Sequence, residues 1–268
     1  MTALREHLEA RREGGRKLLV PYIMGGIPDA HSFPSALAAI ATHADAVEIG
    51  LPYSDPLMDG PVIAAAGERA LRAGLRPLGV VDLVARNEVG PPRAVMTYYN
   101  PIHRIGEHEF CRRAAAAGLS GLIVPDIPIE ESASLQRAAA EHELAWIPLV
   151  APTSSPERVS AIVAGAAGFV YAVSTLGVTG TREELSERAA AVVAACRVAS
   201  DLPVLVGIGV STVAHAAAAA EQADGVVIGS AVVRAVLNEG ADAARAFLSG
   251  VRHELDRVGR AGRSTHIC

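Results

Sequence analysis

The sequence has very little lysine and few aromatic residues. Lys17 is the only lysine among the 268 residues, and Phe, Trp and Tyr together make up 4% of the chain. Lys17 precedes the first apolar run instead of following it. Schiff-base catalysis needs a lysine amine placed against the substrate carbonyl. The sequence therefore argues against a Schiff base and leaves any carbon–carbon chemistry to carboxylates.

Groups of metal ligands and catalytic thiols are missing as well. The nine histidines include no His-x-His pair, and only His103 closely follows a predicted strand. We therefore expect neither a metal site nor a resident cofactor. The three cysteines, Cys111, Cys196 and Cys268, are odd in number and far apart, which is typical of a reducing compartment. None is predicted at the carboxyl end of a strand, which disfavours thiol catalysis.

The chain also lacks a basic surface and a long apolar run. Its formal net charge is -5, which argues against nucleic acid or an anionic membrane as a partner. No apolar run reaches the ~18 residues of a membrane span, and the charged segment 2–16 lacks the apolar centre of a signal peptide. These features predict a soluble, cytoplasmic globular protein.

Short apolar runs alternate with alanine-rich helical segments along the chain. Strict strand–helix alternation is typical of a parallel sheet, and eight units without a linker favour a single (β/α)8 TIM barrel over residues 1–268. An open sheet with a dinucleotide fingerprint is disfavoured, because Gly25-Gly26-Ile27-Pro28 does not fit G-x-G-x-x-G. We expect an extra leading helix within residues 1–17 and a frayed tail over 259–268. The predicted strands are Leu18–Met24, Ala46–Pro52, Arg93–Tyr99, Gly121–Ile127, Ala145–Ala151, Gly168–Ser174, Pro203–Gly209 and Gly225–Ser230.

Two connections are longer than the rest and follow the second and sixth predicted strands. The first holds the Asp55–Asp59 loop and helical segments at 61–74 and 77–88, and the second holds residues 175–182. In a barrel both lie at the carboxyl ends of the strands, where active sites occur. They are candidate lids.

Glu48 is unusual because it interrupts an apolar strand. An unpaired ionised carboxylate buried there costs several kcal/mol unless its pKa rises. Strand alternation places Glu48 on one face with Ala46 and Gly50, which leaves the carboxylate room in the barrel mouth. A raised pKa suits a general acid/base near neutral pH. The alternative is a structural carboxylate that bonds a neighbouring loop.

Other acids have competing interpretations. Asp59 lies beyond the loop after Glu48, but Asp-Gly is also a common turn pair, so the residues alone leave its role open. Asp55 has the same alternative, and Asp126 is expected to organise a loop. Glycines after the last two strands, at a helix start, form the usual phosphate cradle of barrel enzymes. The predicted phosphate contacts are Gly209, Gly229 and Ser230, with Gly180 from the second long loop.

The segment from Glu48 to Pro61, EIGLPYSDPLMDGP, closely resembles the signature of the tryptophan synthase α subunit family. Four further motifs resemble that family in order and spacing, over about residues 18–250. They are Thr97-Tyr98-Tyr99-Asn100-Pro101-Ile102, Val124-Pro125-Asp126-Ile127-Pro128, Ala151-Pro152-Thr153 and Gly177-Val178-Thr179-Gly180.

The resemblance implies a lyase that cleaves indole-3-glycerol phosphate to indole and D-glyceraldehyde 3-phosphate. It implies that Glu48 is the general acid/base, that Asp59 holds the indole N–H, and that Tyr171 is an active-site residue. It implies phosphate contacts at the four positions named above. It implies an indole slot lined by Tyr22, Met96, Ile123, Leu149 and Ile208. Tyr22 and Ile208 stand where Phe is frequent in the family.

The resemblance also implies a partner, a pyridoxal-phosphate β subunit in an α2β2 complex that makes L-tryptophan. Ala64 replaces a commonly polar residue near the surface that meets this partner. Three alternatives therefore stay open: a free-standing lyase of secondary metabolism, a subunit that only activates its partner, and a different phosphosugar enzyme such as an isomerase.

Overall fold

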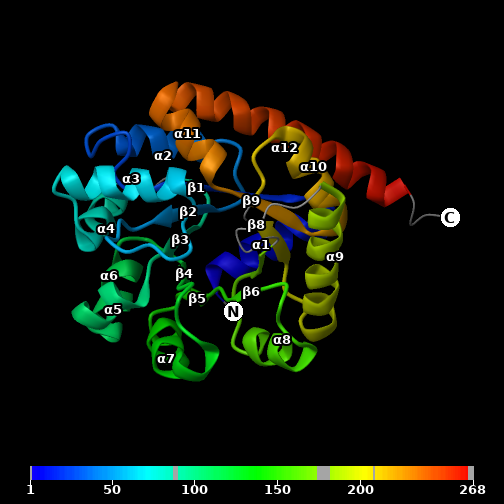
Figure 1. Ribbon diagram of the computed structural model, residues 1–268, viewed down its shortest axis with the longest axis horizontal. Coiled ribbons are helices and arrows are strands. Elements are labelled where there is room, and N and C mark those ends of the chain that lie inside the picture. Colours follow the sequence, from blue (N-terminus) through cyan, green and yellow to red (C-terminus); the bar gives the residue numbers. More distant parts are fainter. Residues whose placement is uncertain (1, 87–89, 174–181, 208, 265–268) are drawn as a thin grey trace.

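Parallel strands form the centre of the molecule (Figure 1). The computed structural model describes residues 2–86, 90–173, 182–207 and 209–264. Within these ranges all strand pairs are parallel, in the order β5-β4-β3-β2-β1-β9-β8-β7-β6. The strands are β1 (Leu18–Met24), β2 (Val47–Gly50), β3 (Arg93–Met96), β4 (Gly121–Ile123), β5 (Ala145–Trp146), β6 (Leu149–Val150), β7 (Val170–Val173), β8 (Val204–Gly207) and β9 (Gly225–Ile228).

Segments β5 and β6 occupy one position in the sheet. Ile147 and Pro148 separate them, and proline has no N–H to donate to a neighbouring strand. The backbone nevertheless bridges the gap: the Ile147 N–H donates to the Leu122 carbonyl at 3.0 Å, and the Tyr171 N–H donates to the Pro148 carbonyl at 3.0 Å. The sheet thus closes into the predicted (β/α)8 barrel, whose fifth predicted strand is split at the proline.

Helices surround the barrel and cover its outer surface (Figure 1). Pro at the first or second position begins α2, α3, α4 and α8, as expected for a residue with no N–H to lose there. The helices are α1 (Ala3–Glu13), α2 (Phe33–Ala41), α3 (Pro61–Arg72), α4 (Pro77–Ala85), α5 (Tyr99–Ile105), α6 (Glu107–Ala116), α7 (Ala133–Glu141), α8 (Pro156–Val163), α9 (Arg182–Ala199), α10 (Val213–Gln222), α11 (Ser230–Asn238) and α12 (Ala241–Ser264), with a 3-10 turn η1 (Ile129–Glu131) before α7.

Strand β1 spans Leu18–Met24 as predicted, whereas β3 and β4 end earlier than the apolar runs predicted. The run expected to reach Tyr99 ends at Met96, because α5 begins at Tyr99. The run expected to reach Ile127 ends at Ile123, and Pro125 and Pro128 follow, which cannot donate a ladder hydrogen bond. The residues released in this way become the loops at the carboxyl end of the barrel, where side chains can point into a site.

Helix α1 closes the amino end of the barrel. Leu4 and Leu8 have no exposed surface and pack with interior side chains such as Phe169 and Leu205. A Cβ atom added at Gly121 would come within 2.8 Å of the Leu4 side chain, so the helix lies directly against the strand. The leading helix is therefore the floor of the barrel.

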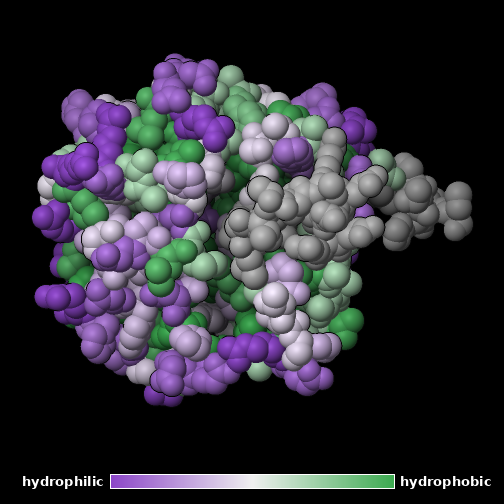
Figure 2. Space-filling view, viewed as in Figure 1, coloured by the Kyte–Doolittle hydropathy of each residue, from purple (hydrophilic) through white to green (hydrophobic). Residues whose placement is uncertain are grey.

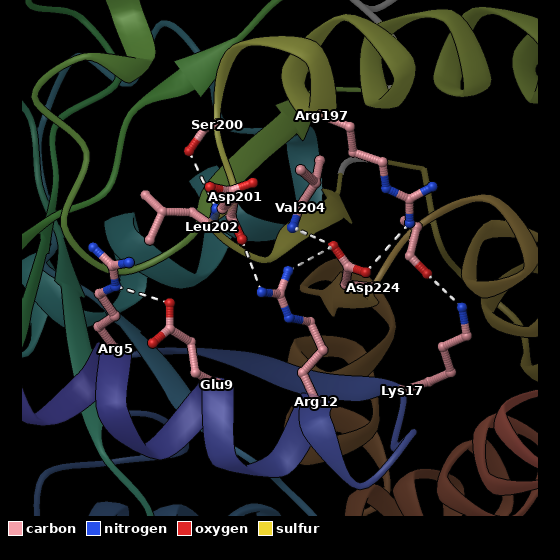
Figure 3. A network of polar contacts seen from close by, with 11 residues as sticks. Arg5, Glu9, Arg12, Lys17, Arg197, Ser200, Asp201, Leu202, Val204 and Asp224 are labelled. Atoms are coloured by element: carbon pink, nitrogen blue, oxygen red, sulfur yellow. Dashed lines mark hydrogen bonds and ion pairs between the residues drawn. The ribbon is translucent and has the colours of Figure 1, made fainter.

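Polar contacts fasten α1 to the turns beneath β8 and β9 (Figure 3). The Arg12 guanidinium donates to the Asp201 carbonyl at 2.8 Å and lies 3.7 Å from the Asp224 carboxylate. Asp224 accepts from the Val204 N–H at 2.8 Å, and Lys17 donates to the Ala223 carbonyl at 2.8 Å. The single lysine thus serves at the amino end of the barrel, opposite the end expected for catalysis.

Helix α12 continues beyond the point where its sequence pattern fades. It packs against α10, α11 and α2, with Leu248, Val251 and Leu255 fully buried, and it is helical through Ser264. The remaining residues of the predicted tail, 265–268, lie outside the described residues. None of the helices in the described ranges combines the length and the apolar character that a membrane span needs.

Candidate active site

A cavity of about 290 Å³ opens at the carboxyl ends of the strands. Every predicted site residue that the structure describes lines it, whereas predicted contacts Gly180 and Ile208 lie outside the described residues. The lining residues are Tyr22, Glu48, Met58, Asp59, Gly60, Ile63, Met96, Ile123, Leu149, Tyr171, Gly209, Val210, Ser211, Val227, Gly229 and Ser230.

Glu48 lies in the interior of the barrel mouth. Its neighbours Val47 and Ile49 pack outward in the core between strands and helices, whereas Ala46 packs inside, as strand alternation predicts. The Glu48 side chain is 1% exposed, and its Oε2 atom has no hydrogen-bond partner among the described residues. Burial, and then the charge of Asp59, raise the pKa of Glu48 to about 8. Such a carboxyl group is largely protonated at neutral pH and can both give and take a proton.

Two tyrosine rings flank Glu48 and require glycine on the adjoining strands. Tyr22 is the register partner of Glu48, and a Cβ atom at Gly50 would lie 1.9 Å from the Tyr22 hydroxyl. A Cβ atom at Gly207 would lie 2.4 Å from the Tyr171 hydroxyl. Burial and nearby carboxylates raise the pKa of both tyrosines well above the ordinary value. Both rings are therefore neutral and form rigid walls around the carboxyl group.

Asp59 lies on the loop between β2 and α3 and is half-buried. Burial raises the pKa of its carboxyl group, and a hydrogen bond with Tyr98 opposes that rise. Asp55 on the same loop is exposed and bonds its neighbour Ser54. Asp126 accepts the Tyr99 N–H at 2.8 Å, which is the loop-organising role expected for it. Of these three acids, Asp59 is the one that lines the cavity.

The opposite wall of the cavity is made of backbone. Gly229 precedes the first turn of α11, Ser230 begins that helix, and both line the cavity, so the positive end of the helix dipole lies beside it. Gly209 adopts a φ of 99°, a left-handed conformation that favours glycine. Val210 and Ser211 continue the same wall. Such a helix start with adjacent glycines is suited to a phosphate group.

Apolar side chains line the space between the carboxylates and the helix start. The predicted slot residues Tyr22, Met96, Ile123 and Leu149 are joined by Ile63 and Val227, which the sequence interpretation missed. Val227 could have been found, because alternation along β9 places it inside with Gly225 and Gly229. Ile63 carries no such signal, since a helical pattern does not reveal which residue overlooks a barrel.

Hydrophilic side chains predominate around the outer rim in the view of Figure 2, and hydrophobic surface shows toward the middle. Among the described residues, no group of three or more His, Cys, Asp or Glu side chains could hold a metal ion. The polar side chains that line the described cavity are the carboxyl groups of Glu48 and Asp59 and the hydroxyl groups of Tyr22, Tyr171, Ser211 and Ser230.

Comparison with known proteins places this site in context. The profile of the family described as tryptophan synthase alpha chain matches residues 8–255. A tryptophan synthase alpha chain of Streptomyces coelicolor is 45% identical over 252 residues, covering 93% of this chain and 92% of that protein. A solved tryptophan synthase from M. tuberculosis is 41% identical with a TM-score of 0.87, covering 95% of this chain and 98% of that one. An alpha subunit from Legionella pneumophila is 32% identical with a TM-score of 0.88, covering 96% and 99%.

Proposed function

The chain belongs to the tryptophan synthase alpha chain family, and we infer that it is a lyase splitting indole-3-glycerol phosphate into indole and D-glyceraldehyde 3-phosphate. The observation that supports this most directly is the buried Glu48, with a pKa raised to about 8, in a cavity that also holds Asp59 and a helix start. The reaction is a retro-aldol cleavage in the biosynthesis of tryptophan.

Glu48 carries both proton transfers. Its protonated carboxyl group gives a proton to C3 of the indole ring, which makes the ring an indolenine-like cation. The carboxylate left behind takes the proton of the C3′ hydroxyl. The C3–C3′ bond then breaks, its electron pair returns to the ring, and the C3′ oxygen becomes the aldehyde oxygen of glyceraldehyde 3-phosphate. One residue can serve both steps because its pKa lies near the working pH.

Asp59 accepts the indole N–H and stabilises the positive charge that develops on the ring. A charge-assisted hydrogen bond of this kind is stronger than a neutral one, and it strengthens as the cation forms. Tyr171 bounds the reacting groups beside Glu48. Tyr22, Met96, Ile123 and Leu149 enclose the indole, with Ile208 a further predicted contact.

The phosphate binds at the start of α11. Gly209, Gly229 and Ser230 supply backbone N–H groups, and Gly180 is a further predicted contact. The helix start carries partial positive charge, which favours the phosphate dianion. The carboxyl groups of Glu48 and Asp59 supply the acid, the base and the charge stabilisation of this cleavage, so the proposed mechanism uses no cofactor on this chain.

The chain works with a pyridoxal-phosphate β subunit in an α2β2 complex that consumes the indole. Two features support this proposal: the solved relatives from M. tuberculosis are tryptophan synthases, and Leu57 and Met58 expose apolar surface beside Asp59. A cytoplasmic location is proposed with it, supported by buried Cys111 and Cys196, which are free thiols.

Indole release from indole-3-glycerol phosphate tests this function, measured with and without a β subunit. We expect slow release by the chain alone and faster release in the complex. Release that is already fast and indifferent to a β subunit would indicate the free-standing lyase. No release in either case would support a subunit that only activates its partner.

A further inference from the structure

Tyr98 follows β3 and lies outside the set of residues that line the cavity. Its backbone is fixed on both sides: the Thr97 N–H donates to the Ile123 carbonyl at 3.1 Å, and the Tyr99 N–H donates to the Asp126 carboxylate at 2.8 Å. The Tyr98 side chain is 2% exposed. Its hydroxyl group is therefore held at a defined point at the edge of the barrel mouth.

The Tyr98 hydroxyl group contacts the loop that carries Asp59. It accepts the Met58 N–H at 2.9 Å, and it lies beside the adjacent Asp59 carboxylate, whose pKa it lowers. The Tyr98 ring stacks on Tyr53 of the same loop with centroids 5.0 Å apart. One tyrosine thus contacts the loop in its first half through the ring and in its second half through the hydroxyl.

Few other bonds fix this loop. Among the described residues, the hydrogen bonds with a measured distance that join residues 52–59 to other parts of the chain are Met58 N–H to the Tyr98 hydroxyl at 2.9 Å and Asn100 to the Tyr53 hydroxyl at 3.1 Å. Tyr98 directly precedes α5, and Asn100 lies in the first turn of that helix. Without the Tyr98 hydroxyl, the position of Asp59 over the cavity loses its nearest anchor.

We propose that Tyr98 is a positioning residue that orients the Asp59 carboxylate toward the indole nitrogen. The proposal rests on the proposed function, since it takes Asp59 as the acceptor of the indole N–H. By donating to one carboxylate oxygen, the hydroxyl group leaves the other oxygen directed at the substrate. By accepting the Met58 N–H, it fixes the backbone next to Asp59.

The hydrogen bond also favours the charged form of Asp59. Burial raises the pKa of Asp59, and the Tyr98 hydroxyl group lowers it again. The other titratable groups that interact with this region are Glu48 from β2, whose pKa the Asp59 charge raises, and Tyr22 from β1. Removal of the hydroxyl group should therefore shift the protonation of Asp59 to higher pH.

Tyr98→Phe tests this role because it keeps the ring and its stacking on Tyr53 but removes the hydroxyl group. We expect kcat/KM for indole-3-glycerol phosphate to fall by ~10-fold, within the range for a hydrogen bond to a charged group. The acidic limb of the pH profile should move to higher pH, and the alkaline limb should stay in place. Tyr99→Phe is the matched control, since it removes only a bond to Glu107 on α6.

Substrate binding provides a second readout that does not need turnover. In a Glu48→Gln background the substrate stays intact, so its Kd can be measured by calorimetry with Tyr98→Phe, Asp59→Asn and both. We expect Tyr98→Phe to weaken binding by ~10-fold when Asp59 is present and by less than ~2-fold when it is Asn.

Three outcomes overturn the assignment. The first is that the effects of Tyr98→Phe and Asp59→Asn on Kd are additive. The second is that the acidic limb of the kcat/KM pH profile does not move in Tyr98→Phe, and the third is that the Tyr98→Phe protein fails to fold. Each result would mean that Tyr98 has only a structural role. Failure of the proposed function looks different, since in that case the wild-type protein neither cleaves nor binds indole-3-glycerol phosphate.

Discussion

Glu48 has a buried carboxyl group whose Oε2 atom has no partner among the described residues, and its chemistry follows from that environment. Burial disfavours the charged form, and the nearby negative charge of Asp59 acts in the same direction. The Glu48 carboxyl group is therefore largely protonated at neutral pH, whereas the carboxyl group of a solvent-exposed glutamate is ionised. The sequence predicted this much, because the interrupted apolar strand and the small flanking residues are local features.

The pH dependence of catalysis should reflect these two acids. The reaction needs Glu48 protonated and Asp59 charged, so kcat/KM should follow a bell-shaped curve. Because the pKa of Glu48 is about 8, kcat/KM should fall above that pH, tending to ~tenfold per pH unit. A profile that stays flat from pH 7 to 10 would exclude Glu48 as the initial acid.

The same shift should make the stability of the fold depend on pH. The folded state holds the Glu48 proton more tightly than the unfolded state, so this contribution to stability is fully present below pH 4.5 and is lost as the pH rises through about 8. Glu48→Gln removes the titration and should be more stable than wild type at pH 9, by a few kcal/mol. Urea unfolding at pH 6 and pH 9 measures this.

The exposed Glu68 on α3 provides the matched control for that measurement. Its side chain is 60% exposed and pairs with Arg72. Glu68→Gln should change the free energy of unfolding by less than ~0.5 kcal/mol at either pH. An equal response of the two variants would contradict the buried-carboxyl interpretation.

At the scale of elements, the loop after β2 carries Asp59, and Tyr98 in the segment after β3 contacts that loop. The sequence pointed only to the first of these two segments as the carrier of the site. The sequence identified the Asp59 loop from its acids and glycines, yet it left Asp59 itself open as a turn residue. Tyr98 stood out only as part of a motif that resembles the family, and its contact with the Asp59 loop was not predicted, because the contact joins residues 40 positions apart. The sequence also predicted β5 and β6 as one strand. The pattern of hydrophobic residues continues through Pro148, although proline has no N–H for a strand hydrogen bond.

Close contact between strands β1 and β2 should make Gly50 intolerant of a side chain. In Gly50→Ala the new Cβ atom overlaps the Tyr22 ring, because it would lie 1.9 Å from the Tyr22 hydroxyl. We expect a loss of ~1–3 kcal/mol of stability from overpacking and a fall in kcat/KM as Tyr22 is displaced. Thermal unfolding and indole release measure the two effects.

Gly79→Ala serves as the control for that substitution. Gly79 lies within α4, and an added Cβ atom meets only the Leu75 side chain at an ordinary 3.8 Å. Stability should stay unchanged or rise by about 0.5–1 kcal/mol because alanine favours the helix, and indole release should not change. Equal losses in both variants would refute the steric argument.

At the scale of the whole molecule, helix α1 closes the amino end of the barrel. The sequence predicted a leading helix from its spacing, but not that Leu4 and Leu8 fill the barrel interior. That packing depends on small residues at distant positions, such as Gly121 and Gly168, whose proximity only the closed barrel creates. The Arg12 side chain then fastens the helix through its ion pair with Asp224 and its hydrogen bond to the Asp201 carbonyl (Figure 3).

Leu8→Ala should therefore destabilise the whole barrel. Leu8 is fully buried, and its truncation leaves a cavity in the floor, so we expect a loss of about 2–5 kcal/mol. Activity of the folded fraction should persist, since the site lies at the other end of the strands. Val198→Ala, at a side chain 91% exposed, should change stability by less than ~0.5 kcal/mol, and urea unfolding compares the two.

Whether Glu48 is the acid/base of the cleavage is tested most directly by comparing indole release by wild type and Glu48→Gln. Substrate binding is measured in parallel. Glutamine keeps the size of the side chain but cannot give and retake a proton. We expect indole release to fall by at least ~100-fold while indole-3-glycerol phosphate still binds. Unchanged turnover in the Glu48→Gln protein would contradict this role of Glu48.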